Sequence, residues 1–171
     1  YGNLTVEEQE AVVRYINETL GTAIIMGDRE PYINTHTLNN ISKPFGVEYL
    51  YGNVTDETDY DYKYYYPFVH VWTNTSPAQM IVDGYEYKVK MATTSLNISD
   101  PSLNGTKYQI YKVGIGDDDT KFNNTIWGNN VTYLIHIAPV KGKGGAIISG
   151  ATSLIRDQYW YPMYNNRDFI L

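Results

Sequence analysis

The sequence predicts a mainly β fold: an antiparallel β-sandwich of the jelly-roll type with one amphipathic α-helix at the N-terminus. Short runs rich in β-branched and aromatic residues recur along the chain, and turn signals separate them roughly every 8–15 residues. The strongest turn signal is Asp83-Gly84, between residues 79–82 and 85–92, which is typical of a two-residue β-hairpin. With 171 residues, the chain is long enough for one substantial core, so we expect residues 1–171 to form a single globular domain.

Residues 5–20 have the pattern of an amphipathic helix. Thr5 is a favourable N-cap, and Glu8 three residues later completes a capping box. Apolar residues recur at helical spacing at Val6, Val13, Ile16 and Leu20. Asn17 falls on the opposite face, which we expect to be exposed to solvent, and Gly21 is expected to end the helix.

The later segments are predicted mainly as strands. We expect a buried strand at residues 22–26, a turn at Gly27-Asp28, and a further short strand at residues 32–36. Other predicted strands cover residues 45–51, 64–73, 107–115 and 131–138. The aromatic tail, residues 157–171, ends in Phe169, Ile170 and Leu171. These three apolar residues are expected either to pack on their own domain or to add a strand to the open edge of a neighbouring copy.

The chain is acidic, with a net charge of −6 and an isoelectric point of about 4.9. This charge argues against nucleic acid and anionic membrane surfaces as main partners, because both favour basic patches. No apolar run reaches the roughly 18 residues that a membrane-spanning helix needs, so we expect no direct membrane insertion. The absence of cysteine fits either a cytosolic protein or a secreted protein that does not rely on disulfides.

Acceptor triplets for N-linked glycosylation decide between these two locations. Nine of the 15 asparagines begin an Asn-x-Ser/Thr triplet, whereas about two are expected by chance from the composition. The acceptors are Asn3, Asn17, Asn40, Asn53, Asn74, Asn97, Asn104, Asn123 and Asn130. This excess predicts a secreted or cell-surface glycoprotein that carries covalent N-linked glycans.

A glycosylated chain that is rich in tyrosine and asparagine and lacks cysteine resembles the secreted surface glycoproteins of archaea, which form S-layers, filaments, tubes and sheaths. The resemblance implies a structural subunit of an extracellular polymer, assembled from copies of itself through edge strands and tyrosine-rich contacts. The alternative is a secreted carbohydrate-binding or adhesion module, because aromatic faces also stack on sugar rings.

Two acidic segments are candidate calcium sites, because loop carboxylates supply the hard oxygen ligands that calcium prefers. The first contains Asp117, Asp118 and Asp119, and the second contains Asp56, Glu57, Asp59 and Asp61. The alternative for both is a solvated acidic turn. His70 and His136 lie among apolar residues, a pattern more typical of half-buried strand histidines than of a metal pair. The sequence contains neither a nucleophile elbow nor a phosphate loop, so we expect no enzymatic activity.

Overall fold

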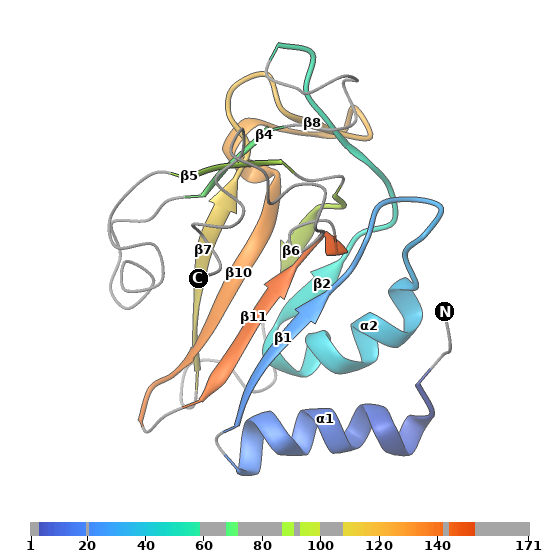
Figure 1. Ribbon diagram of the computed structural model, residues 1–171, viewed down its shortest axis with the longest axis vertical. Helices are drawn as coiled ribbons and strands as arrows, with labels where there is room; N and C mark the ends of the chain where they lie inside the picture. The colour runs from blue at the N-terminus through green and yellow to red at the C-terminus, as the bar shows by residue number, and fades with distance from the viewer. Residues whose placement is uncertain are drawn as a thin grey trace.

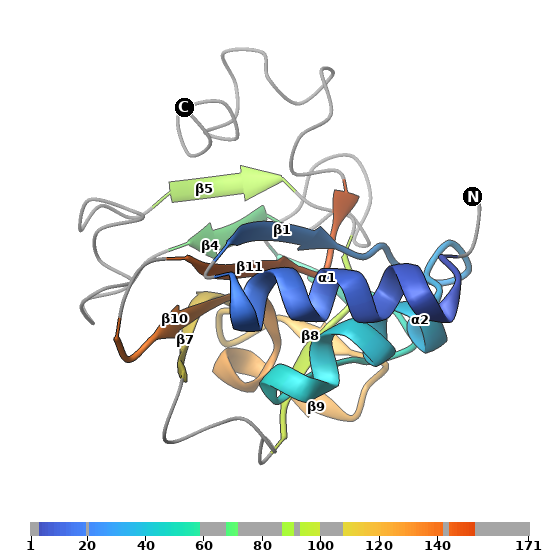
Figure 2. The ribbon, with the colours of Figure 1, turned by 90° about the horizontal axis from the view of Figure 1, so that it is seen from below.

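The computed structural model describes residues 4–19, 21–58, 68–71, 87–90, 93–99, 108–141 and 144–152. Its central sheet has six strands: β1 (Thr22–Met26), β4 (Phe68–Val71), β5 (Tyr87–Lys90), β7 (Tyr108–Ile115), β10 (Thr132–Pro139) and β11 (Gly145–Ser149). The strand order in this sheet is β1-β11-β10-β7-β4-β5. Helices α1 (Val6–Glu18) and α2 (Thr35–Ser42) cover one face of the sheet (Figure 1, Figure 2).

Two smaller sheets accompany the central one. The first pairs β2 (Val47–Tyr49) with β6 (Leu96–Ile98), and the second joins β3 (Val54–Thr55), β8 (Lys121–Phe122) and β9 (Ile126–Trp127) in the order β3-β8-β9. Short 3₁₀ turns, Lys43–Phe45 and Gly128–Asn130, precede β2 and β10. The prediction of a mainly β fold is therefore confirmed, although the described residues form two α-helices where one was predicted.

The pairing of β1 corrects the predicted topology. β1 and β11 run parallel, with Thr22 opposite Gly145 and Met26 opposite Ser149, while the other pairs of the central sheet are antiparallel. The expectation of a purely antiparallel arrangement is wrong at this edge, because a short apolar run does not encode the direction of its partner. β1 is also an edge strand, with Ile24 60% exposed, and not the buried strand that was predicted.

Helix α1 begins as predicted. The Glu8 N–H donates to Thr5 Oγ1 at 3.3 Å, and the Thr5 N–H donates to Glu8 Oε2 at 2.8 Å, so both bonds of the capping box are present. The predicted faces are partly wrong. Val6 is 62% exposed, whereas Asn17 is half-buried and its Oδ1 accepts a hydrogen bond from the Tyr108 hydroxyl at 3.4 Å. The helix ends at Glu18, ahead of the predicted stop at Gly21.

Helix α2 occupies a region for which a strand and a loop were predicted. Asn34 caps it by accepting a hydrogen bond from the Thr37 N–H at 3.2 Å. Threonine, asparagine and histidine are weak helix formers, which explains why the sequence pattern did not indicate a helix. Tertiary bonds stabilise it instead: the Asn39 side chain bonds both the N–H and the C=O of Tyr49, at 2.7 and 3.1 Å.

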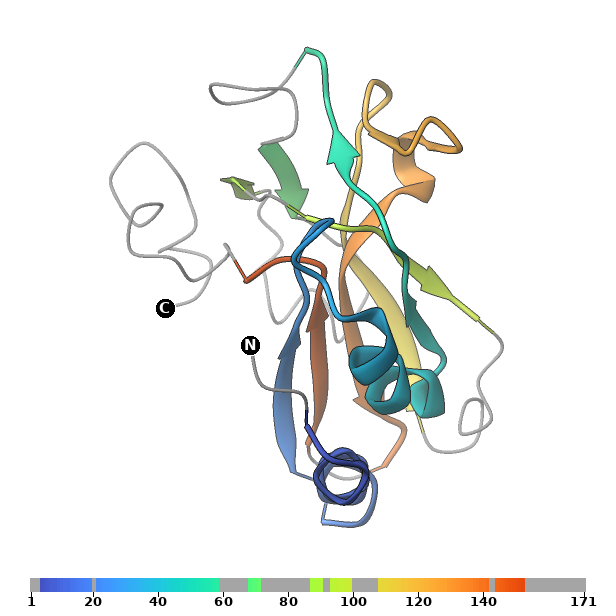
Figure 3. The same ribbon diagram turned by 90° about the vertical axis from the view of Figure 1, so that its right-hand side faces the viewer.

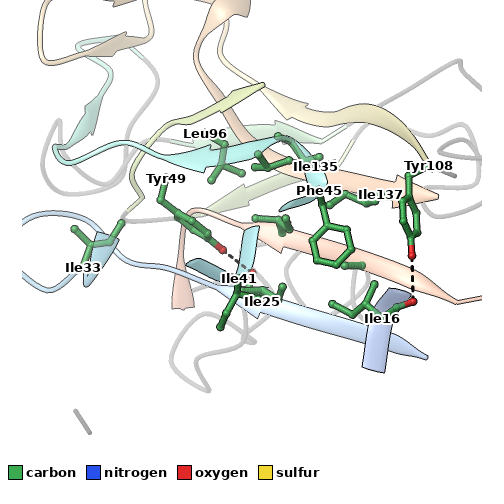
Figure 4. Packing of buried hydrophobic residues seen from close by; sticks show 13 residues of the cluster. Ile16, Ile25, Ile33, Ile41, Phe45, Tyr49, Leu96, Tyr108, Ile135 and Ile137 are labelled. Carbon is green, nitrogen blue, oxygen red and sulfur yellow. Dashed lines mark hydrogen bonds between the residues drawn. The ribbon is translucent and has the colours of Figure 1, made fainter. Parts of the chain in front are cut away.

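The main core lies between the helices and the central sheet (Figure 4). Its buried residues include Ile16, Ile25, Ile41, Phe45, Val47, Tyr49, Leu96, Tyr108, Ile135, Ile137 and Ile148. The Phe45 and Tyr108 rings meet edge to face, with centroids 5.5 Å apart. Both buried tyrosines satisfy their hydroxyls on backbone carbonyls: Tyr49 donates to Ile25 O at 2.9 Å and Tyr108 to Ile16 O at 3.2 Å. These bonds tie β2 to β1 and β7 to α1.

A second core cluster joins the three-stranded sheet to the central sheet. It contains Val54, Val113, Phe122, Val131, Tyr133, Leu134 and Ala151. Among the described residues, no helix is long and apolar enough to cross a bilayer. The predicted hairpin turn at Asp83-Gly84 and the aromatic tail, 157–171, with its candidate assembly residues Phe169, Ile170 and Leu171, lie outside the described residues.

Candidate functional site

A cleft opens where the parallel strands β1 and β11 end. Because the strands are parallel, their carboxyl ends meet at the same edge of the sheet, where open α/β sheets commonly bind ligands. The cleft has a volume of about 240 Å³ and lies beside the N-terminus of α2. Its lining residues are Leu4, Met26, Gly27, Asp28, Tyr32, Ile33, Asn34, Thr37, Leu38 and Thr152. We call it the β1–α2 cleft; Figure 3 shows the same end of the fold from the side.

Gly27 lets the chain leave β1 close to the core. Its N–H donates to Ser149 O at 2.7 Å, which extends the β1–β11 pairing by one bond. A Cβ at this position would lie 2.6 Å from Cε1 of the buried Tyr49, closer than real Cβ contacts allow. The close packing of Gly27 against the Tyr49 ring therefore fixes the point at which the next residue, Asp28, enters the cleft.

The carboxylate of Asp28 is held by the ends of both strands. Its Oδ1 accepts a hydrogen bond from the Arg29 N–H, and its Oδ2 accepts one from Thr152 Oγ1, each at 2.8 Å. Thr152 lies just beyond β11, so this bond joins the ends of β1 and β11 across the cleft. A carboxylate with one donor on each oxygen keeps a second acceptor position on each, because an ionised carboxylate offers about four lone-pair sites.

The mouth of the cleft is apolar and exposed. Tyr32 is 59% exposed and Leu4 is 40% exposed, and both line the cleft. The guanidinium of Arg29 lies over the Tyr32 ring, with its Cζ 5.5 Å from the ring centroid. Exposed large apolar side chains around a hollow are typical of sites that bind another molecule.

A second hollow, the α1–α2 groove, lies between the two helices. It has a volume of about 440 Å³ and is lined by Val6, Gln9, Glu10, Val13, Arg14, Asn40 and Pro44. The Asn40 Nδ2 group donates to Gln9 Oε1 at 2.8 Å and so links the two helices. Leu4 of the cleft and Val6 of the groove lie two residues apart at the start of α1, so the two hollows are neighbours.

The structure brings the two predicted acidic segments together. Asp56 is fully buried, and its Oδ2 lies 3.0 Å from Thr120 Oγ1. The Thr58 hydroxyl lies 3.1 Å from both Asp56 Oδ1 and Asp119 Oδ2, and Thr120 Oγ1 lies 2.9 Å from Asp117 Oδ1. Each hydroxyl carries one hydrogen and so donates to one carboxylate at a time, and through these contacts Thr58 and Thr120 connect the two loops.

The remaining acidic residues are dispersed. Asp118 is exposed, Glu57 pairs with Lys121 at 3.3 Å, and Asp59 and Asp61 lie outside the described residues. Within the part of the chain that the structure describes, no three acidic or histidine side chains form a group suited to a metal ion. Calcium binding at Asp117, Asp118 and Asp119 stays a prediction.

His136 lies on β10, half-buried, with its ring stacked on Tyr111 at a centroid distance of 6.2 Å. Burial lowers the pKa of the His136 imidazole, so it is neutral at pH 7. Its Nδ1 is buried without a hydrogen-bond partner, and its half-buried position on a strand is the one expected from the sequence. His70 belongs to β4, where its backbone lies opposite Lys88 of β5 and Ile115 of β7 in the sheet.

The predicted glycosylation acceptors fall into four groups. Asn97 and Asn130 are exposed, while Asn17 and Asn53 are half-buried. Asn40 and Asn123 are exposed, but their Nδ2 groups donate to Gln9 Oε1 and Tyr51 O. Asn3, Asn74 and Asn104 lie outside the described residues. Glycosylation stays a prediction.

The β1–α2 cleft was not predicted from the sequence. A turn was predicted at Gly27-Asp28 without a role, because the helix that follows it was not predicted. An apolar strand, then Gly-Asp, then an Asn-x-x-Thr cap is the strand–loop–helix signal that indicates such a site.

No protein-family model matches the sequence, and no curated protein matches it significantly. The structure is similar to a solved structure described as "mmIFT52 N-terminal domain", with a TM-score of 0.67 and 14% sequence identity. The similarity covers 98% of this chain and 68% of that chain. With so low a sequence identity, the similarity shows a shared fold and nothing more.

This similarity corrects the expected function. We expected a subunit of an extracellular filament, tube, sheath or surface layer, built from an antiparallel sandwich, and that expectation is wrong. The chain instead has a mixed sheet with a parallel edge, and a solved structure that shares its fold is described as an IFT52 N-terminal domain. The second expectation, a secreted carbohydrate-binding or adhesion module, gains no support from this neighbour.

Proposed function

We propose that this chain is a non-catalytic protein-binding domain that holds a partner polypeptide at the β1–α2 cleft. One observation carries the proposal: Tyr32 and Leu4, both large and exposed, surround a cleft that contains a fixed carboxylate. Protein interfaces concentrate binding energy in such places, where aromatic and apolar anchors surround a polar group that fixes orientation. The neighbouring α1–α2 groove extends the same surface.

Two further observations support this proposal. The hydroxyl of Thr152 and the carboxylate of Asp28 bond each other at 2.8 Å, which suits fixed recognition groups better than a reacting pair. The similar fold of the IFT52 N-terminal domain supports a role inside a larger transport assembly. We also propose that the two smaller sheets act as a second β layer on the central sheet, since each contributes buried residues to a core cluster that it shares with the central sheet.

Site-directed photo-crosslinking in the native host tests the proposal. A photoreactive phenylalanine replaces Tyr32 in one variant and Trp127 in a control variant, because Trp127 is 48% exposed but belongs to β9 of a different sheet. We expect a discrete crosslinked polypeptide with the first variant, and the purified partner should then bind wild-type protein and lose affinity for Tyr32→Ala. Equal crosslinking from both positions, or unchanged affinity of Tyr32→Ala, would contradict the proposal.

A further inference from the structure

We infer that the β1–α2 cleft receives a basic side chain, arginine above all, from the partner polypeptide. This inference rests on the proposed protein-binding function and names the chemistry that the cleft recognises. The cleft combines apolar walls with one charged group, and these two properties match the two parts of an arginine or lysine side chain.

The walls suit the stem of such a side chain. Met26, Ile33 and Leu38 line the cleft, and arginine and lysine bury their methylene stems against apolar surface while the charged head reaches a polar site. Of the ten described lining residues, Asp28 is the only acidic or basic one. Its two oxygens each keep an acceptor position, so they can bind a guanidinium through two parallel hydrogen bonds.

Two positive features lie nearby, but Asp28 is the only acidic or basic side chain among the described residues that line the cleft. The N-terminus of α2 opens on the cleft, but a helix terminus carries only about half an elementary charge, against the full charge of the Asp28 carboxylate. Arg29 is not among the residues that line the cleft, and its guanidinium lies over the Tyr32 ring. The net charge of −6 also favours the approach of a cation.

Peptide titrations of the isotopically labelled chain, followed by NMR at low ionic strength, test the inference. The probes are acetyl-Gly-X-Gly-amide peptides in which X is arginine, lysine, citrulline or norleucine. Citrulline has the shape of arginine without its charge, and norleucine has only the apolar stem. We expect the arginine peptide to shift the amide signals of Gly27, Leu38 and Thr152, and to bind about 10- to 100-fold more tightly than the citrulline peptide.

Asp28→Asn should remove this preference. Asp118→Asn is the matched control, because it removes the same charge from an exposed carboxylate outside the cleft and should leave the preference intact. Equal affinity for arginine and citrulline would overturn the inference, and so would a preference that survives Asp28→Asn or is lost in Asp118→Asn. The comparison on the wild-type chain decides the matter even where a variant fails to fold. Binding without charge preference would leave the proposed function standing, since photo-crosslinking tests that function separately.

Discussion

Replacing Tyr49 by phenylalanine should reveal how the core supports the cleft. Tyr49 is 1% exposed, its ring packs behind Gly27, and its hydroxyl donates to Ile25 O at 2.9 Å. Removing one buried hydrogen bond between uncharged groups costs about 1 kcal/mol of unfolding free energy at neutral pH. For a chain of this size, that loss lowers the melting temperature by roughly 2–4 °C.

The same substitution should have the opposite effect at high pH. Burial raises the pKa of Tyr49 well above its ordinary value of 10.0, so the native hydroxyl keeps its proton after the unfolded one has lost it. This contribution to stability is fully present below pH 10 and is lost as the pH rises, by about 1.4 kcal/mol per pH unit. Tyr49→Phe lacks this loss, so the two proteins should become equally stable between about pH 10.5 and 11.

Urea unfolding followed by far-ultraviolet circular dichroism, at intervals from pH 7 to 11, measures both effects. The pKa of Tyr108 is also raised by burial, but Tyr108 is present in both proteins and its effect cancels in the difference. Stability curves that stay parallel across the whole pH range would refute the reasoning, because they would mean that the Tyr49 hydroxyl titrates equally in both states.

Three further predictions concern the cleft, the acidic loops and the acceptor asparagines. Gly27→Ala forces a Cβ into the tyrosine ring behind it and should cost about 1–3 kcal/mol in urea unfolding, with shifted NMR signals around the cleft. Thr120→Val removes a hydroxyl from the buried carboxylate of Asp56 at similar volume, and should cost about 1–3 kcal/mol; an unchanged midpoint would show that this bond contributes nothing. Mass spectrometry of the native protein should find glycans at Asn97 and Asn130, the exposed acceptors whose side chains form no hydrogen bond within the described part of the chain; unmodified peptides at both would contradict the prediction.

Elements that depend on neighbouring residues could be predicted from the sequence, whereas elements that depend on contacts between distant residues could not. The capping box of Thr5 and Glu8 predicts the start of α1 because all of its atoms lie within four residues. The strands β7 and β10 follow from their residue patterns for the same reason. Helix α2 could not be predicted, because the bonds of Asn39 to Tyr49 that stabilise it come from β2.

The candidate site depends even more on distant pairing. Asp28 and Thr152 are 124 positions apart in the chain, and nothing near either residue indicates the other. The same holds for the two acidic segments, which the sequence presents as separate loops and which Thr58 and Thr120 join in space. The amino-acid composition suggested an extracellular polymer because composition reflects the chemistry of the surface. Composition does not show which strands pair, and strand pairing determines the fold.

The parallel pairing of β1 with β11 also constrains how the protein can be made. Thr22 and Gly145 are direct neighbours in the sheet, although most of the chain separates them. At roughly 5–20 residues per second, a ribosome needs roughly 6 to 25 s between releasing these two segments. During that interval β1 and α1 exist without the strand that completes their core, and pairing over such a separation is intrinsically slow. The edge of β1 that pairs with β11 must therefore be tolerated or shielded until β11 has been synthesised, and the cleft cannot form before Thr152 is available to bond Asp28.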